Sequence, residues 1–177
     1  MLELGHRHFL YLPGPKYNLS QTRRYAGIMD ALSEANVPAS NIREIDYHTV
    51  FGSSAESTSS YKPYEELFFP VNYTAVIGFN DLQSYSAMEI LQKKGYRIPE
   101  DISLISFDHL RKTHTYLPPL TSIADNSEKS IADTAVSILL DKIRNPSSEI
   151  SSEVLPVSIF DDHTTGPINE TFAHSFE

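Results

Sequence analysis

Short apolar runs alternate with helical patterns along the first 108 residues. Four runs have the length and composition of buried strands: residues 9–12, 42–47, 74–79 and 104–107. The segments between them space apolar residues by three and four, clearly in 25–35 and 83–94 and weakly in 61–68. The βαβαβαβ order predicts an α/β fold with a parallel sheet and helices on both faces, because right-handed crossovers return each strand beside its neighbours.

The junction at residues 94–108 shows how this pattern ends a helix and starts a strand. Gly95 suits the position after a helix, and Pro99 prevents the helix from continuing. The apolar run at 104–107 then leads directly to Asp108. Because ligands of open α/β sheets bind at the carboxyl ends of the strands, Asp108 is placed to face one.

The pattern changes after Asp108. Pro118-Pro119 is stiff and extended, and 127–144 have the apolar periodicity of a strong helix. The segment 154–160 alternates as a last strand. We expect 166–177 to be a frayed, flexible tail, because its apolar content is low.

Composition excludes several classes of protein. The 177 residues suffice for one domain, and the formal charge of −9 comes without a basic cluster, so this chain alone should not bind nucleic acid. The absence of cysteine excludes disulfides, thiol nucleophiles and thiolate metal sites, which fits a cytoplasmic protein. No apolar run approaches the roughly 20 residues of a membrane span, and the first residues lack the order of a signal peptide.

Polar groups follow several of the predicted strands and should meet at one edge of the sheet. They are the segment 13–15, Tyr47, the pair 80–81 and Asp108, joined by Arg24 from the first helix. A guanidinium, an amide, carboxylates and an aromatic ring are groups that hold a small polar molecule. Simpler roles stay open: Asn80 and Asp81 also suit a helix cap, Arg24 a surface ion pair, and Tyr47 plain packing.

Catalytic and metal motifs are missing from the sequence. The seven histidines are scattered, and neither His109 beside Asp108 nor the segment 161–163 has metal-ligand spacing. Ser106 lies inside an apolar strand rather than in a nucleophile elbow. Gly14 is a lone glycine, so no phosphate or dinucleotide loop is present. We therefore expect no metal, no cofactor and no catalytic residue.

Taken in order, these segments resemble the LacI/GalR family of bacterial transcription regulators. The matching residues run through nearly the whole chain: Gly5-His6-Arg7, Pro13-Gly14-Pro15, Arg24-Tyr25-Ala26-Gly27, 74–81, 95–108, 118–123 and 155–158. The resemblance implies a periplasmic-binding-protein-like core of two α/β subdomains with an effector in the cleft between them. Such a regulator senses a small molecule, most often a sugar, acts as a homodimer, and binds operator DNA through an N-terminal helix-turn-helix.

The resemblance also assigns parts of the chain. Residues 1–165 correspond to the C-terminal part of the effector-binding core, with 5–108 as the C-terminal subdomain. The crossover and helix at 118–145 normally belong with the N-terminal subdomain, and 154–160 form the return strand. The helix-turn-helix, the hinge and the first subdomain are absent, so we expect a fragment of a regulator. Without its usual neighbour, the helix 127–144 should expose an apolar stripe.

Carried over by position, Arg24, Asn80 and Asp108 match the usual effector contacts, and Tyr47 and Asp125 match further ones. The sequence departs from the family pattern at Ile28, where an aromatic is frequent, and at His109, where a second acid is frequent. The Ser-rich segment 52–60 lengthens the second crossover. The contact set suits sugar hydroxyls and equally another polar metabolite.

The family's dimer surface would use the helix 83–94 and the loop 111–117. It implies Tyr85, Met88, Tyr116 and Leu117 as contacts, although Met88 suits a core position and the tyrosines an ordinary surface. Two other functions share the fold: a solute-binding protein for uptake, and an α/β enzyme. The first would need an export signal or a lipid anchor, and the second a nucleophile–base pair or a cofactor loop.

Overall fold

The computed structural model describes residues 1–15, 17–45, 64–127, 130–149 and 152–174. In these residues a six-stranded sheet has the order β2-β1-β3-β4-β5-β6. The strands are β1 (Phe9–Leu12), β2 (Ile42–Glu44), β3 (Ala75–Gly78), β4 (Ser103–Phe107), β5 (Ser122–Asp125) and β6 (Val157–Phe160). The helices are α1 (Leu19–Glu34), α3 (Asp81–Lys93), α4 (Ile131–Arg144) and α5 (Glu170–Ala173). Short 3-10 turns are η1 (Leu2–Leu4), η2 (Ala39–Asn41), η3 (Tyr64–Phe68) and η4 (Leu110–Lys112).

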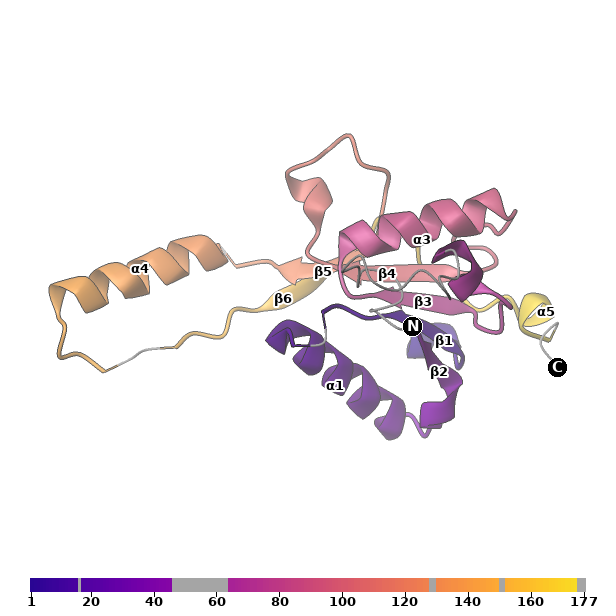
Figure 1. Ribbon diagram of the computed structural model, residues 1–177, viewed down its shortest axis with the longest axis horizontal. Helices are drawn as coiled ribbons and strands as arrows, with labels where there is room; N and C mark the ends of the chain where they lie inside the picture. Colours follow the sequence, from indigo (N-terminus) through magenta and orange to yellow (C-terminus); the bar gives the residue numbers. More distant parts are fainter. Residues whose placement is uncertain (16, 46–63, 128–129, 150–151, 175–177) are drawn as a thin grey trace, which may run out of the picture.

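Helices cover both faces of the sheet, as the alternation predicted (Figure 1). β1 pairs with β3 and β3 pairs with β4, both in parallel. Successive residues of a strand point to opposite faces of the sheet. Leu10 packs with Val76 and Leu91 on the face of α3, whereas Tyr11 packs with Leu32 on the face of α1. β1 and β3 are therefore buried on both sides, which explains their unbroken apolar runs.

The far edge of the sheet differs from the prediction. Residues 122–125 form β5, which the sequence suggested only as an extended crossover, and β6 pairs with it antiparallel. The sheet is mixed because the chain leaves along β5, forms α4 and returns along β6 on the same edge. The short β5 carries polar residues at both ends, Ser122 and Asp125, so it has no apolar run from which a strand could be predicted.

Capping residues set the ends of the helices. Asn18 accepts hydrogen bonds from the amides of Ser20 and Gln21 and begins α1. Ser130 and Asp133 form a capping box at the start of α4. This helix therefore begins at Ile131, later than the predicted 127. The pattern of residues 61–68 produces only the 3-10 turn η3 in its described part, 64–68.

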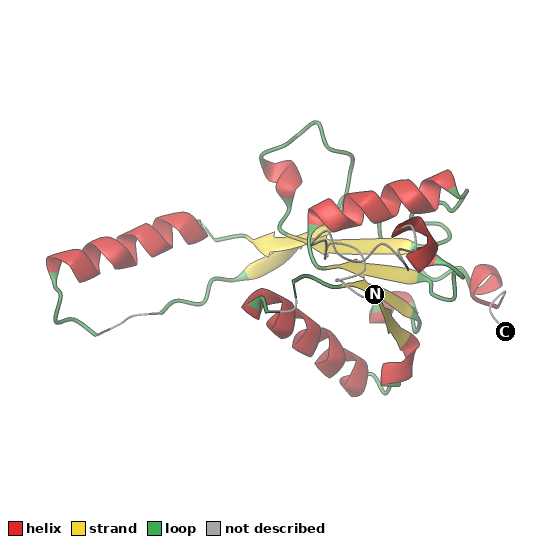
Figure 2. Cartoon of the chain, viewed as in Figure 1, coloured by secondary structure: helices red, strands yellow, loops and turns green. Residues whose placement is uncertain are grey.

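The helix α4 projects away from the body of the molecule on the β5–β6 ribbon (Figure 2). Ile131, Val136, Leu139 and Ile143 on this helix keep between 53% and 64% of their surface exposed. The predicted apolar stripe on the helix is confirmed. None of the described helices is long and apolar enough to cross a bilayer.

Residues 166–174 make specific contacts where we expected a frayed tail, and 175–177 lie outside the described residues. The amide of Ile168 donates to the carbonyl of Leu4 at 2.8 Å, and Asn169 caps the short helix α5. Phe172 on that helix meets the ring of Tyr96 edge-on, with centroids 5.9 Å apart. A few well-placed contacts hold residues 166–174, and the overall composition of the segment did not reveal them.

Candidate functional site

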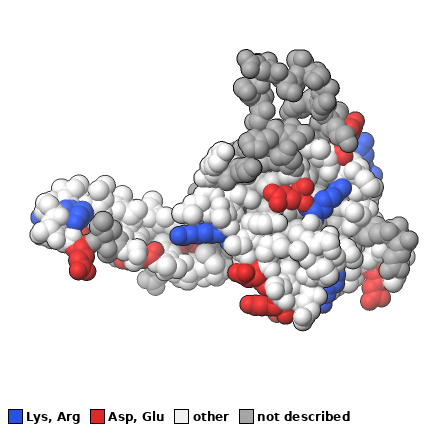
Figure 3. All heavy atoms as spheres, turned by 60° about the horizontal axis from the view of Figure 1, so that its bottom comes forward, with Lys and Arg blue, Asp and Glu red and all other residues white. Residues whose placement is uncertain are grey.

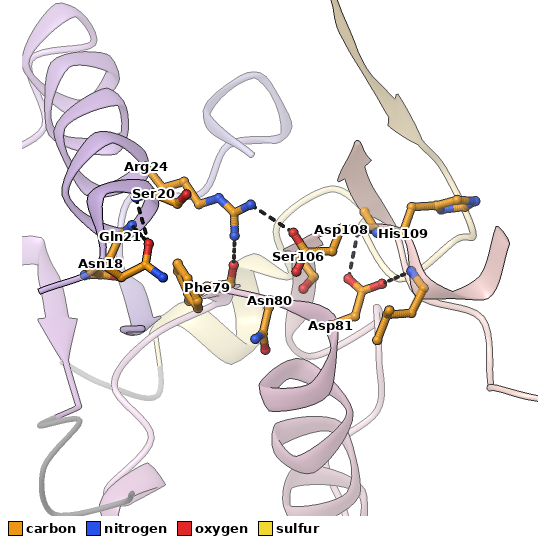
Figure 4. Close-up of polar contacts among 12 residues, drawn as sticks. Asn18, Ser20, Gln21, Arg24, Phe79, Asn80, Asp81, Ser106, Asp108 and His109 are labelled. Atoms are coloured by element: carbon orange, nitrogen blue, oxygen red, sulfur yellow. Dashed lines mark hydrogen bonds and ion pairs between the residues drawn. The ribbon is translucent and has the colours of Figure 1, made fainter. Parts of the chain in front are cut away.

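Arg24 extends from α1 across the carboxyl edge of the sheet (Figure 4). Its Nη2 lies 2.9 Å from Oδ1 of Asp108, and its Nη1 donates to the carbonyl oxygen of Phe79 at 2.5 Å. The guanidinium carbon lies 4.8 Å from the ring centroid of Phe79 and 4.6 Å from that of Phe107. Hydrogen bonds and two aromatic rings thus fix the orientation of this cation at the ends of β3 and β4.

Asp108 sits on a tight turn directly after β4. Its φ angle is 96°, and that of the next residue, His109, is 48°. Both values lie in the left-handed region that non-glycine residues rarely adopt. The amide of Asp108 donates to the carbonyl of Ile123 on β5 at 3.0 Å. The turn directs the carboxylate back toward Arg24, with 43% of the side chain still exposed.

A cleft of about 680 Å³ opens beside this ion pair. Its polar groups include Arg24, Asp108, Lys112 and Asp125, and its apolar wall comes from β5, β6 and the inner face of α4. A few convergent polar groups on an apolar wall are typical of a small-molecule site. Three of the five predicted ligand residues, Arg24, Asp108 and Asp125, therefore lie on one cleft.

Asn80 lies outside that cleft. Its Oδ1 accepts from the amide of Gln83 at 3.0 Å, which makes it the cap of α3, and its carbonyl accepts from the hydroxyl of Ser84 at 3.0 Å. It lines a separate hollow of about 300 Å³ with Asn18 and Phe79. The structure shows the capping role of Asn80, and an effector contact stays a prediction.

Asp125 is the last residue of β5. Its carboxylate accepts hydrogen bonds from the hydroxyl and, at 2.8 Å, the amide of Ser127. The hydroxyl bond, followed by the amide bond, holds the pKa of Asp125 below its usual value, so the group is an anion at neutral pH. Tyr47, the fifth predicted ligand residue, lies outside the described residues, as does the segment 52–60.

Sequence reasoning missed the place of Asp81. The sequence suggested a helix cap or a ligand contact for it, but its carboxylate accepts from the amide of Leu110 at 2.7 Å and from the hydroxyl of Ser122 at 2.8 Å. Only 1% of the residue is exposed. Its partners lie 29 and 41 residues away, so no local pattern could have identified them.

The turn after β4 is also held from the side of β6. The ring of His109 stacks on that of Phe160, with centroids 4.2 Å apart. Arg111 pairs with Asp162 at 2.8 Å and donates from Nε to the carbonyl of Leu117. Residues 108–117 are thus tied to the β5–β6 side of the molecule.

The residues implied for a dimer surface lie on α3 and in the loop between η4 and β5. Tyr85, Met88 and Leu117 line a depression of about 860 Å³, and the hydroxyl of Tyr85 donates to the carbonyl of Pro118 at 3.2 Å. Met88 is buried in the core under α3, whereas Tyr116 is 81% exposed. Met88 therefore occupies the core position that its residue type allowed.

Charged side chains of both signs lie on the face of the molecule shown in Figure 3. On the face shown in Figure 3, blue and red atoms are scattered and the basic residues form no continuous patch. Within the described ranges, no three His, Asp or Glu side chains are placed to share a metal ion.

A model of the periplasmic binding protein-like domain matches residues 1–165. The chain belongs to this family. The repressor PurR of Escherichia coli O139:H28 is 34% identical over 160 residues, which cover 88% of this chain and 44% of PurR. The resemblance to LacI-type regulators is thereby confirmed, and this periplasmic binding protein-like chain spans about half the length of the curated relatives it matches.

Solved structures give the same family assignment. A dimeric Lac repressor with an 11-residue C-terminal deletion aligns with a TM-score of 0.73 and 27% identity, over 95% of this chain and 58% of the repressor chain. A regulator from Alkaliphilus metalliredigens QYMF complexed with D-xylulofuranose gives 0.69 and 26%, over 93% and 59%. A ribose-bound LacI family regulator from Enterococcus faecium, at 24% identity and a TM-score of 0.74, shares the fold.

Proposed function

We propose that this chain is the effector-binding and dimerisation part of a LacI-type transcriptional regulator, most simply a repressor, that senses a sugar or a similar small polar metabolite. The observation that carries the proposal is the Arg24–Asp108 pair at the mouth of the 680 Å³ cleft. A fixed guanidinium donates hydrogen bonds and a carboxylate accepts them, so a hydroxyl placed between them can do both. The sugar held by the A. metalliredigens regulator supports this ligand class.

The exposed face of α4 supports a larger assembly. Its apolar residues would be covered by a first subdomain supplied by the rest of the regulator, which would also complete the cleft over Arg24 and Asp108. Ligand binding would then favour one relative orientation of the two subdomains, because a ligand shifts an equilibrium by its differential affinity for the two states. In a homodimer joined through Tyr85, Tyr116 and Leu117, that shift would change the spacing of N-terminal heads on operator DNA in the cytoplasm.

Relatives that are repressors favour regulation over the two other functions. A solute-binding protein for uptake would bind the same class of ligand without affecting DNA. An enzyme would transform it, whereas a binding protein returns its ligand unchanged. Incubation with the ligand followed by mass analysis, together with operator binding by the whole gene product, separates the three.

The direct test is calorimetric titration of the whole gene product with D-xylulose and a panel of pentoses and hexoses. We expect saturable binding of at least one sugar, and at least about a tenfold weaker affinity for Arg24→Ala and Asp108→Ala, since each loses a charge-assisted hydrogen bond. Arg97→Ala is the matched control, because Arg97 pairs with Asp101 away from the cleft. Binding that is unaffected by both cleft substitutions would contradict the proposal.

A further inference from the structure

The turn that carries Asp108 is an unfavourable backbone conformation. Two consecutive residues, Asp108 and His109, have φ angles of 96° and 48°. Such left-handed conformations are unfavourable for a residue with a Cβ. Interactions elsewhere must therefore stabilise the turn, and they determine where the Asp108 carboxylate lies.

Three successive amides of the turn are hydrogen bonded. The amide of Asp108 donates to the carbonyl of Ile123, that of His109 to the hydroxyl of Ser122 at 2.9 Å, and that of Leu110 to Oδ2 of Asp81 at 2.7 Å. The Ser122 hydroxyl in turn donates to Oδ1 of Asp81 at 2.8 Å. One carboxylate thus holds the turn directly through Leu110 and indirectly through Ser122.

The Asp81 carboxylate is buried and is held by hydrogen bonds. No Lys or Arg among the described residues forms an ion pair with it, and 1% of the residue is exposed. A buried carboxylate is costly unless hydrogen bonds satisfy it. The donors are the turn itself and Ser122, with a favourable contribution from the first turn of α3. The carboxylate and the turn therefore stabilise each other.

We propose that Asp81 is a positioning residue for the cleft: it holds the Asp108–His109 turn in the one conformation that presents the Asp108 carboxylate to Arg24. Figure 4 shows Asp81 directed toward this turn, and Asp108 directed toward Arg24. Asp81 itself does not line the cleft. Its importance for ligand binding rests on the proposed function, whereas its control of the turn can be tested without any ligand.

The test replaces one oxygen of the Asp81 carboxylate by an NH2 group. In Asp81→Asn the charged acceptor becomes neutral, so its bond to the Leu110 amide is weakened, whereas the Ser122 hydroxyl can turn to accept from the new amide group. Hydrogen exchange of the 177-residue chain, followed by NMR, reports on the turn through the Leu110 amide and on the cleft through the Arg24 guanidinium. We expect exchange at both to be about 10- to 100-fold faster, since a hydrogen bond to a charged group is weakened.

The matched control is Asp101→Asn. Asp101 accepts from the amide of Arg97 at 2.9 Å and pairs with its side chain at 2.6 Å, in the turn that precedes β4. This variant should lower thermal stability while exchange at Leu110 and Arg24 stays within about twofold. Asp108→Asn should accelerate exchange at Arg24 alone, and adding Asp81→Asn to it should accelerate Arg24 no further, because Asp81 acts through Asp108.

Unchanged exchange at Arg24 in a folded Asp81→Asn chain would overturn the proposal and leave Asp81 a structural residue only. If that variant does not fold, Ser122→Ala decides. It removes the link between His109 and Asp81 and keeps the bond to Leu110, so exchange at Arg24 should rise by a smaller factor. Unchanged exchange at Arg24 in Ser122→Ala would then refute the role. No sugar enters these measurements, so a failure here is distinct from a failure of the proposed function.

Discussion

The Nη2 atom of Arg24 lies 2.9 Å from the Oδ1 atom of Asp108, although 84 residues separate them in the sequence. This ion pair is partly exposed, with 24% and 43% of the two side chains accessible. Solvent therefore screens it, and its contribution to stability should be small. Arg24 also donates to Phe79 and lies against two aromatic rings, which Asp108 does not.

We predict that the two partners differ in their importance for folding. Asp108→Asn should lower the free energy of unfolding by less than about 1 kcal/mol. Arg24→Ala should lower it by about 1–2 kcal/mol, because the bond to Phe79 and the ring contacts are lost as well. Urea denaturation of the two variants measures the difference, and equal losses would show that the ion pair dominates.

Gly78 and Gly27 should respond in opposite ways to alanine. A Cβ on Gly78, at the end of β3, would collide with the Oγ of Ser84 and lie 3.3 Å from the carbonyl oxygen of Asn80. A Cβ on Gly27, inside α1, meets nothing within 4 Å. Gly78→Ala should therefore destabilise the fold by about 1–3 kcal/mol. Gly27→Ala should stabilise it by about 0.5–1 kcal/mol, since glycine is a poor helix former.

Thermal denaturation of the two variants provides the comparison. Ser84→Ala combined with Gly78→Ala should recover part of the loss, because the colliding hydroxyl is gone. A tolerated Gly78→Ala would mean that the end of β3 can move away from α3, contrary to the close approach seen here.

His6 should make the stability of the chain depend on pH. It is buried, and its Nε2 donates to the carbonyl of Gly166 at 3.0 Å. Since a carbonyl can only accept, Nε2 carries the proton, and in the neutral ring Nδ1 accepts from the Thr74 hydroxyl at 2.9 Å. Burial lowers the pKa of His6 from its ordinary value of 6.5, although the bond to Gly166 opposes the change.

A lowered pKa means that the unfolded chain takes up a proton before the folded one does. The contribution of His6 is complete above pH 6.5 and is lost as the pH falls from there to the lower pKa of the folded chain. The slope from one proton is at most about 1.4 kcal/mol per pH unit. Urea denaturation at pH 7.5 and 5.5 should show the loss, and His6→Gln should flatten it. An equal pH dependence in both proteins would contradict this assignment.

The apolar stripe on α4 should contribute to association and little to the stability of this chain. Leu139→Glu with Ile143→Glu should change the free energy of unfolding by less than about 0.5 kcal/mol, because both side chains are already exposed. The buried Leu104→Ala, as a contrast, should cost about 2–5 kcal/mol. Sedimentation velocity should show less self-association for the double variant. An unchanged distribution would mean that the stripe does not associate.

The central part of the fold could be predicted because the apolar sequence of its strands corresponds to their burial in the core. The residues of β1 and β3 are buried on both faces, so their sequences are unbroken apolar runs, and in β4 only Ser103 and Ser106 are polar. β5 gave no such signal, since Ser122 and Asp125 serve hydrogen bonds rather than the core. The antiparallel direction of β6 follows from the path of the chain through α4, which no local pattern contains.

The same distinction applies to the site. Arg24 and Asp108 could be predicted to meet because the carboxyl ends of parallel strands share one edge of a sheet. The role of Asp81 depends on two left-handed residues and on partners from β5 and η4, and these come together only in the folded chain. Asn80 could be predicted to lie nearby, but its side chain is directed to the amide of Gln83 rather than into the cleft.

The adjacent, antiparallel course of β5 and β6 brings both ends of α4 back to one edge of the sheet. The helix follows β5 after Asp125 and precedes β6 at Val157, so both of its connections to the body start from this ribbon. A pair of fluorophores, one on α4 and one on α1, would report a movement of the helix against the body as a change in one distance, which makes this edge of the sheet a natural place for an optical sensor.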